Sequence, residues 1–367
     1  MYYYFLGNTP DLSLLELESV TGQDFLRITP FIVCGDLEES KLPIIYNLGG
    51  LRKVAVSAKT GLRKNVNTLL SEVLSTVANK NVAITDYATA NLDRSDLHAL
   101  KSTVTRPIRF VSMETSEHEL LMLSHQKVAE LNILPDPTRS ENIIIALTSW
   151  IFDAEDWVKR DRNKPYRDIK RGMLPPKVAR IMANLALCGK SGKTLYDPFC
   201  GTGTVLSEGA LIGSSHLFGS DTNKTAVDGA LMNLDWISRT YPSSTSLKHL
   251  EVADATHPPF SSVDAIATEP YMGPLLDDRN PLPLDKIKDI AKGLDKLYRG
   301  AFKAWYNILP VGGRVVMTIP SFAVYGRVIP TISVDTVVSL GYNYISSVAY
   351  GKPGATVIRN ITVLEKK

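Results

Sequence analysis

The chain has 367 residues, of which 44% are hydrophobic and 22% charged; this globular balance predicts two or three domains and excludes an overall disordered chain. Its net charge of +3 and pI near 8.5 give a weak overall field, so any nucleic-acid contact has to come from local basic patches. Cys34, Cys188 and Cys200 are widely spaced, which argues against a disulfide framework or a metal site and favours a reducing, cytoplasmic interior.

The N-terminus lacks a basic leader with a long apolar core, and no apolar run reaches membrane length. We therefore expect neither secretion nor insertion into a membrane.

The first part of the chain, residues 1–152, mixes short β-rich runs with amphipathic stretches and predicts an α+β domain. The predicted strands are 2–6, 31–33, 54–56, 82–84 and 108–111. The predicted helices are 14–20, 69–77, 96–100 and 123–131. No catalytic constellation stands out in these residues.

Residues 153–176 are polar and rich in basic side chains, which predicts a linker. A solvated face is the plain interpretation of this cluster, and contact with nucleic-acid phosphates is the functional one. The basic residues in question are Lys159, Arg160, Arg162, Lys164, Arg167, Lys170 and Arg171. Pro175 and Pro176 then fit the first turn of a helix, where a missing N–H costs nothing.

Residues 177–367 alternate strands and helices, which predicts a doubly wound α/β domain with its ligand beyond the carboxyl ends of the strands. The seven predicted strands are 194–196, 216–219, 247–252, 263–268, 314–318, 344–349 and 357–364. The last two are expected to form a hairpin across residues 351–354.

A glycine-rich segment, Asp197-Pro-Phe199-Cys-Gly201-Thr-Gly203-Thr204, joins the first of these strands to a helical run over 205–211. Such a turn brings backbone N–H groups and a helix N-terminus close to a ligand. It is not a phosphate-binding P-loop, because no Gly-Lys-Ser/Thr follows. Its spacing also differs from the G-x-G-x-x-G pattern of nicotinamide cofactor sites.

Two further acids end the next strands. Asp221 is placed to accept both ribose hydroxyls of an adenosine, and Asp254, followed by Ala255, is placed to accept the adenine amino group. Carboxylates at strand ends are common on protein surfaces. Their order behind the glycine turn is what favours the functional interpretation.

The segment 197–204 resembles motif I of amino-methylating class I methyltransferases, and the chain most resembles the tRNA guanine-N2 methyltransferase group with an N-terminal THUMP domain. The stretch 167–177, which includes Leu174, resembles the segment that lies over the cofactor in that group, and 350–364 resembles its terminal hairpin. The resemblance implies a Rossmann-like domain that binds S-adenosyl-L-methionine through these residues, and an N-terminal region that binds RNA.

Glu269, Pro270 and Tyr271 occupy the place of the group's D-P-P-Y or N-P-P-Y motif. A carboxylate and a proline carbonyl can accept both hydrogens of an exocyclic amine, and an aromatic ring can stack on the base. The motif departs from the pattern, because the acid is Glu and only one proline follows. Either Met272 takes the aromatic position and Tyr271 replaces the second proline, or Tyr271 is the stacking residue and one residue is missing.

The resemblance implies methyl transfer to N2 of a guanosine in tRNA, and an activating protein partner stays open. One alternative is a DNA methyltransferase acting on adenine N6 or cytosine N4, since the motifs do not choose among aminated bases. Another is a catalytically silent RNA-binding protein that keeps its cofactor affinity.

Overall fold

The computed structural model describes the whole chain except residues 91, 112–126, 169–172, 245 and 280–281. The chain forms two compact units, which are described separately. The first comprises Met1–Leu14, Gln23–Tyr46 and Gly50–Val158. The second comprises Leu15–Gly22, Asn47–Gly49 and Lys159–Lys367, so two short segments from the first 50 residues belong to it.

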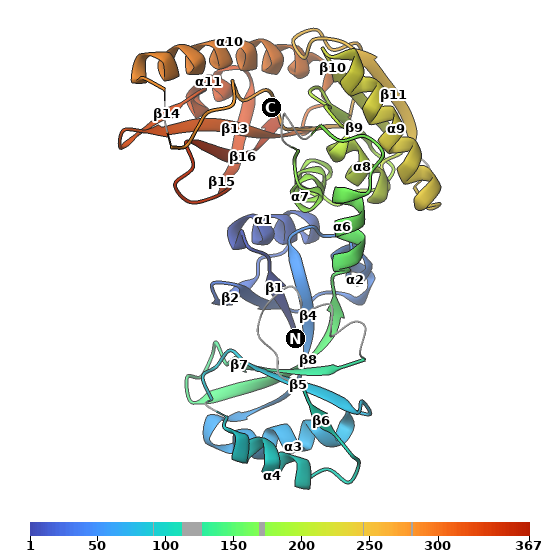
Figure 1. Cartoon of the computed structure of the whole chain (residues 1–367), viewed down its shortest axis with the longest axis vertical. Coiled ribbons are helices and arrows are strands. Elements are labelled where there is room, and N and C mark those ends of the chain that lie inside the picture. Colours follow the sequence, from blue (N-terminus) through green and yellow to red (C-terminus); the bar gives the residue numbers. More distant parts are fainter. Residues whose placement is uncertain (91, 112–126, 169–172, 245, 280–281) are drawn as a thin grey trace. The chain divides into compact units, whose positions relative to one another are not determined.

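The first unit is built on an eight-stranded, mostly antiparallel sheet of order β2-β3-β1-β4-β8-β7-β5-β6 (Figure 1). Its strands are β1 (Tyr2–Leu6), β2 (Leu26–Thr29), β3 (Ile32–Gly35), β4 (Leu51–Leu62), β5 (Asn81–Asp86), β6 (Arg109–Phe110), β7 (Ala129–Pro135) and β8 (Asn142–Ile151). The helical elements of this stretch are α1 (Pro10–Thr21), η1 (Glu39–Lys41), α2 (Leu42–Ile45), η2 (Arg63–Asn65), α3 (Val66–Thr76) and α4 (Arg94–Ser102).

The apolar faces of α3 and α4 form the core of the first unit against this sheet. Leu70, Leu74 and Leu100 pack with Val82 of β5 and Ile145 of β8. Asp93 fixes the start of α4 with a capping box, in which its side chain accepts from the Asp96 N–H and the Asp96 side chain accepts in return.

One sequence prediction in this unit is wrong where the structure describes it. The predicted helix 123–131 falls partly outside the described residues, and its last three residues belong to strand β7. Apolar residues at helical spacing suggested the helix. Pairing with β5 on one side and β8 on the other fixes the segment as a buried strand instead.

The predicted linker 153–176 contains a helix, α6 (Ala154–Arg162). The Asp153 carboxylate accepts from the Asp156 N–H at 3.0 Å, as an N-terminal cap does. Acidic residues occupy the first turn of α6 and basic residues the last, which suits the helix dipole. Local sequence thus stabilises a helix in a stretch whose polarity suggested a solvated connection.

The second unit is a mixed sheet of order β11-β10-β9-β12-β13-β16-β15, with an eighth strand, β14, paired to β13. Its strands are β9 (Thr194–Asp197), β10 (His216–Asp221), β11 (Leu247–Val252), β12 (Ala265–Thr268), β13 (Arg314–Val324), β14 (Arg327–Pro330), β15 (Tyr342–Tyr350) and β16 (Val357–Lys366). The helices are α7 (Pro176–Leu187), α8 (Thr204–Leu211), α9 (Lys224–Thr240), α10 (Leu284–Ile308) and α11 (Val334–Ser339).

All seven strands predicted in this part are present, and the last two form the predicted antiparallel hairpin. The predicted count of seven is corrected by β14, which the sequence analysis missed. The strands β9 to β13 run parallel, and β16 is antiparallel to β13. The strand order reverses at β9, between β10 and β12. In a doubly wound sheet this point opens the crevice in which ligands bind.

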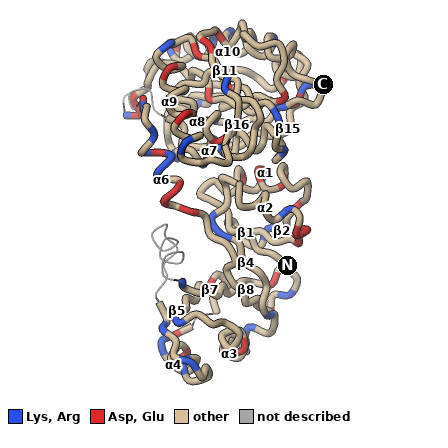
Figure 2. Tube along the Cα trace, turned by 90° about the vertical axis from the view of Figure 1, so that its right-hand side faces the viewer, with Lys and Arg blue, Asp and Glu red and all other residues tan. Residues whose placement is uncertain are grey.

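Helices cover the sheet of the second unit. Helix α7 is buried over its whole length apart from Lys177. The long helix α10 packs Tyr298, Phe302 and Trp305 against sheet residues such as Tyr196 and Val315. Among the described helices, none combines the length and the apolarity that crossing a membrane requires. Lys and Arg are interspersed with Asp and Glu over both units (Figure 2).

Candidate functional site

The glycine turn after β9 lies at the reversal point of the second sheet. Gly201 and Gly203 adopt φ values of 49° and 74°, which are costly for residues with a side chain. A Cβ at Gly203 would also come within 3.0 Å of the Ala230 Cβ, because α9 passes close to the turn. Gly203 is the N-cap of α8, and no side chain caps this helix end. The first N–H groups of α8 are therefore free of a side-chain partner.

The acids at the strand ends surround this turn. The Asp221 carboxylate accepts from the backbone N–H of Gly201 at 3.1 Å and of Asn223 at 2.9 Å. Asp254 is exposed, and hydrogen bonds from the Thr256 side chain and N–H hold the pKa of its carboxyl below the ordinary value. Asp254 is thus ionised near neutral pH, and the carboxyl oxygens of both acids keep lone pairs for a ligand.

Asp197 differs from the other two acids because it is only 2% exposed. It accepts hydrogen bonds from the Thr268 hydroxyl at 2.6 Å and the Phe199 N–H at 3.1 Å. Burial outweighs these bonds and raises the pKa of Asp197 to about 7, and the negative charges of Asp221 and Glu269 add to the rise.

Glu269 follows β12 directly, at the same edge of the sheet. Its carboxylate lies 3.5 Å from the Arg359 guanidinium of β16. Burial raises the pKa of Glu269, and the nearby Arg359 opposes the rise. Pro270 is buried, whereas the Tyr271 side chain is 57% exposed, and the Tyr271 carbonyl accepts a hydrogen bond from Tyr298 of α10.

One cavity of about 820 Å³ brings these residues together. Of the residues that the sequence analysis proposed for the site, those lining the cavity are Leu174, Asp197, Phe199, Gly201, Thr204, Asp221, Asp254, Ala255, Glu269, Pro270 and Tyr271. Gly203 is not part of the lining and shapes the turn instead. Met272 lines the cavity as Tyr271 does, so both alignments of the catalytic motif stay open.

A clamp on the glycine turn was missed by the sequence analysis. The Asn233 side chain of α9 is buried; its amide donates to the carbonyls of Tyr166 and Thr202, at 2.9 and 2.8 Å, and its oxygen accepts from the Tyr166 N–H at 2.9 Å. The Tyr166 ring lies against Gly229, where an added Cβ would collide with it. The sequence did contain a signal for this clamp, because Asn233 is a polar residue on the apolar face of α9.

The basic cluster splits into two groups. Arg160 and Lys164 are buried, so the expectation that they contact phosphates is corrected. Arg160 pairs with Glu208 of α8 at 2.8 Å, and Lys164 donates to the Thr204 hydroxyl at 3.0 Å. Lys159, Arg162 and Arg167 are exposed, and for them the phosphate interpretation stays a prediction. Lys170 and Arg171 lie outside the described residues.

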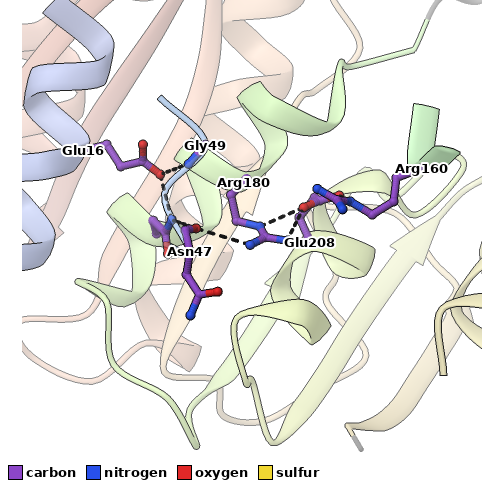
Figure 3. Close-up of polar contacts among 7 residues, drawn as sticks. Glu16, Asn47, Gly49, Arg160, Arg180 and Glu208 are labelled. Carbon is purple, nitrogen blue, oxygen red and sulfur yellow. Dashed lines mark hydrogen bonds and ion pairs between the residues drawn. The ribbon is translucent and has the colours of Figure 1, made fainter. Parts of the chain in front are cut away.

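A buried network of charged side chains fixes the position of helix α8. Glu208 lies between Arg160 and Arg180 (Figure 3), which it contacts at 2.8 and 2.6 Å. Arg180 also donates to the Asn47 carbonyl, and Glu16 accepts from the Gly49 N–H at 2.9 Å. The glycine turn therefore rests on a helix that charged side chains hold in place within the second unit.

The residues present fit S-adenosyl-L-methionine. The cavity combines an uncapped helix N-terminus, two acids at successive strand ends and a Gly201 whose Cβ would meet no atom closer than 3.9 Å. These groups suit the carboxylate, the ribose and the base of an adenosyl amino acid. Within the described part of the chain, no three His, Cys, Asp or Glu side chains are arranged to hold a metal ion.

Comparison with known proteins agrees with this geometry. Residues 164–282 match the model of the RMKL-like methyltransferase domain. Over 168 residues the chain is 33% identical to the tRNA (guanine(10)-N2)-dimethyltransferase of Pyrococcus abyssi, covering 44% of this chain and 43% of that protein. It is 29% identical to the enzyme of the same name from Methanocaldococcus jannaschii over 205 residues, which cover 50% and 57% of the two chains. The chain thus matches about half the length of these curated relatives.

Among solved structures, TrmN from Thermus thermophilus aligns over 100% of this chain and 99% of its own, with a TM-score of 0.52 and 16% identity. At this identity the likeness establishes a shared α/β methyltransferase fold. Residues 164–282 thus match a methyltransferase domain, and the comparisons confirm that the chain resembles the tRNA guanine-N2 methyltransferase group.

Proposed function

We propose that the chain transfers a methyl group from S-adenosyl-L-methionine to the exocyclic N2 amine of a guanosine in tRNA. The observation that carries this proposal is one shared cavity, in which the glycine turn and its acids face Glu269 and Pro270. The names of the relatives indicate the substrate, a guanine in tRNA, and they make guanine 10 the first nucleotide to examine.

When bound, the cofactor would supply a methyl group on a sulfonium: the C–S bond would break as the N–C bond forms, leaving a neutral thioether, and one amine proton would pass to water. The guanine amine is a poor nucleophile, because its lone pair is delocalised into the ring. Glu269 and the Pro270 carbonyl accept the two amine hydrogens and fix the direction of the nitrogen. The negative charge of Glu269 also stabilises the amine while it is transiently cationic.

The first unit is proposed to be the THUMP-containing region that binds the RNA by backbone and shape. What supports this role is a separate sheet-and-helix unit preceding the methyltransferase domain. The domain limits 1–152 and 177–367, with a connection between them, belong to the same proposal. The target base has to be turned out of the RNA to enter the cavity.

The proposal is tested by incubating unmodified tRNA with the full chain and isotope-labelled cofactor, followed by mass spectrometry of the nucleosides. We expect labelled N2-methylguanosine or its dimethylated form. In Glu269→Gln the rate should fall on the order of 100-fold, the cost of losing one preorganised charged contact, while cofactor affinity is retained. Label on adenosine or cytidine, or cofactor binding without any product, would replace this function with one of the two alternatives.

A further inference from the structure

Arg359 is a charged residue in the cavity wall that the proposed reaction does not yet use. It lies near the start of β16, two residues after Val357, and both line the cavity because alternate residues of a strand share a face. Since β16 runs antiparallel to β13, its start reaches the edge at which β12 ends. That topology places Arg359 beside Glu269, 90 positions earlier in the sequence.

The contact between the two side chains leaves hydrogen-bonding capacity on both. Their separation of 3.5 Å exceeds the roughly 2.7–2.9 Å of a strong charge-assisted hydrogen bond. A guanidinium has five N–H donors and a carboxylate about four acceptor positions, so one loose contact saturates neither group. Among the described residues Glu269 is the close ion-pair partner of Arg359, and both side chains keep partial exposure, 38% and 21%.

The other charged or titratable groups near this pair do not replace it. Asp197, at the end of β9, interacts with Glu269 electrostatically as a second acidic group and is not a cation. Tyr350 lies opposite Arg359 on β15, and burial raises the pKa of its phenol. Asp278 interacts with Arg359 electrostatically while its carboxylate accepts from the Thr356 N–H at 2.8 Å. Among the described residues that line the cavity, Arg359 is therefore the cationic donor that accompanies Glu269.

We propose that Arg359 determines base specificity by donating a hydrogen bond to O6 of guanine while Glu269 accepts from N1–H and N2–H. This inference rests on the proposed function. Guanine presents an acceptor, a donor and a donor along its Watson–Crick edge. The Arg359–Glu269 pair presents a donor and two acceptors, the same order that cytosine offers to guanine in a base pair.

The same pair disfavours the other aminated bases. Adenine and cytosine each present a ring nitrogen acceptor next to the exocyclic amine. If the amine of either base met Glu269, that ring nitrogen would face a carboxylate oxygen with no hydrogen between them. Unpaired acceptors in a desolvated site are costly, and a site built for hydrogen bonding rejects such analogues strongly. The longer side chain of Glu269, compared with the Asp or Asn of related enzymes, gives one carboxylate the reach to serve both N1 and N2.

The test compares tRNA carrying guanine with tRNA carrying 2-aminopurine at the methylated position. 2-Aminopurine keeps the 2-amino group but lacks both O6 and N1–H, so the unmodified chain should methylate it slowly, and each variant is compared with the unmodified chain on the same base. In Arg359→Met, single-turnover methylation of guanine should fall roughly 10- to 100-fold, the discrimination that one good side-chain–base contact supplies. Methylation of 2-aminopurine should change less than about twofold, because the lost donor had no acceptor there.

A matched control is Glu365→Gln. Glu365 of β16 pairs with Arg314 of β13 at the same 3.5 Å, but neither residue lines the cavity. We expect its rates on both bases to equal those of the unmodified chain. Circular dichroism melting checks that Arg359→Met is folded, and Arg359→Lys, which keeps a cationic donor, should recover part of the guanine rate.

Three outcomes are distinguishable. A loss confined to guanine supports the inference. An equal loss on guanine and 2-aminopurine overturns it, since Arg359 would then act only by positioning Glu269, and the proposed function would stand. If the unmodified chain methylates no guanine in tRNA, the proposed function fails, and the inference fails with it.

Discussion

Asp197 shows how burial sets the chemistry of one residue in the cavity. Its carboxyl ends β9 inside the sheet, where the loss of water disfavours the charged form and two hydrogen bonds compensate only in part. With a pKa of about 7, it is about half protonated in the free chain at neutral pH. A cationic ligand bound nearby would favour the ionised form.

We therefore predict that S-adenosyl-L-methionine binds more tightly as the pH rises through about 7, because ionised Asp197 attracts the positively charged cofactor. Below that pH, binding should release a proton, which calorimetry in buffers of different ionisation enthalpy detects. Asp197→Asn should lose this pH dependence. Affinity that varies equally with pH in both chains would show that another group is responsible.

The unfolding free energy changes with pH in the opposite direction to the cofactor affinity. The folded chain holds the Asp197 proton up to about pH 7, whereas an unfolded chain releases it near its ordinary value of 3.8. The stability from this group is thus complete below that ordinary value and is lost as the pH rises through about 7. Asp197→Asn should flatten this part of the curve of unfolding free energy against pH, measured by urea denaturation.

The sequence predicted the positions of some cavity residues but not of others. Asp221 ends its strand, and Asp254 and Glu269 follow theirs within two residues, so the doubly wound pattern alone predicted a common edge. Arg359 could not be predicted in this way, because its place depends on β16 running antiparallel to β13. A basic residue within the apolar run of β16 was the one available signal.

At the scale of elements, the clamp between α9 and the glycine turn gives a testable prediction. In Asn233→Ala, three hydrogen bonds to Tyr166 and Thr202 are lost, and the partly buried backbone groups of these residues lose this partner. We expect a loss of about 3 kcal/mol in unfolding free energy, given roughly 1 kcal/mol for each bond. Cofactor affinity should fall at least tenfold, because the turn is no longer held.

The control is Asn307→Ala, which removes a weak 3.4 Å bond from an exposed position on α10. Its denaturation midpoint and its cofactor affinity by calorimetry should match those of the unmodified chain. If Asn233→Ala lost stability but kept full cofactor affinity, the clamp would be a packing feature without influence on the cavity.

Elements were predicted best where local pattern and tertiary pairing agree. The strands of the second unit are apolar runs closed by turn residues, and all seven predicted ones are present. Strand β14 was missed because it is short and mostly exposed, and its existence depends on pairing with β13. Helix α6 was missed because its charged surface resembles a linker, although Asp153 and the charge order along the helix favour helix formation.

At the scale of the whole molecule, the chain contributes to the second unit from three separate parts of the sequence. Ser19 of α1 accepts from Arg314 at 2.7 Å, and Asn184 of α7 donates to Glu16 at 2.7 Å. No periodicity in the sequence indicates that residues 15–22 and 47–49 belong with the methyltransferase domain. The predicted limits 177–367 consequently omit residues that this unit contains.

A fragment of residues 177–367 should therefore fail to fold stably. It lacks Arg160, whose loss from the buried network with Glu208 costs about 3–5 kcal/mol. It also lacks the Glu16 carboxylate that satisfies Asn184. These losses approach the total stability of about 5–15 kcal/mol typical of a domain. Urea denaturation followed by tryptophan fluorescence should show no cooperative transition, and calorimetry no cofactor binding.

The full-chain variant Glu208→Gln separates this explanation from a general effect of truncation. It leaves Arg160 and Arg180 buried without their shared counterion, so the unfolding midpoint should drop clearly while the chain still folds. Should the 177–367 fragment unfold cooperatively and bind the cofactor as tightly as the full chain, the predicted domain limits would be sufficient. The contacts of residues 15–22 and 47–49 would then be dispensable, because the sheet and its helices would fold without them.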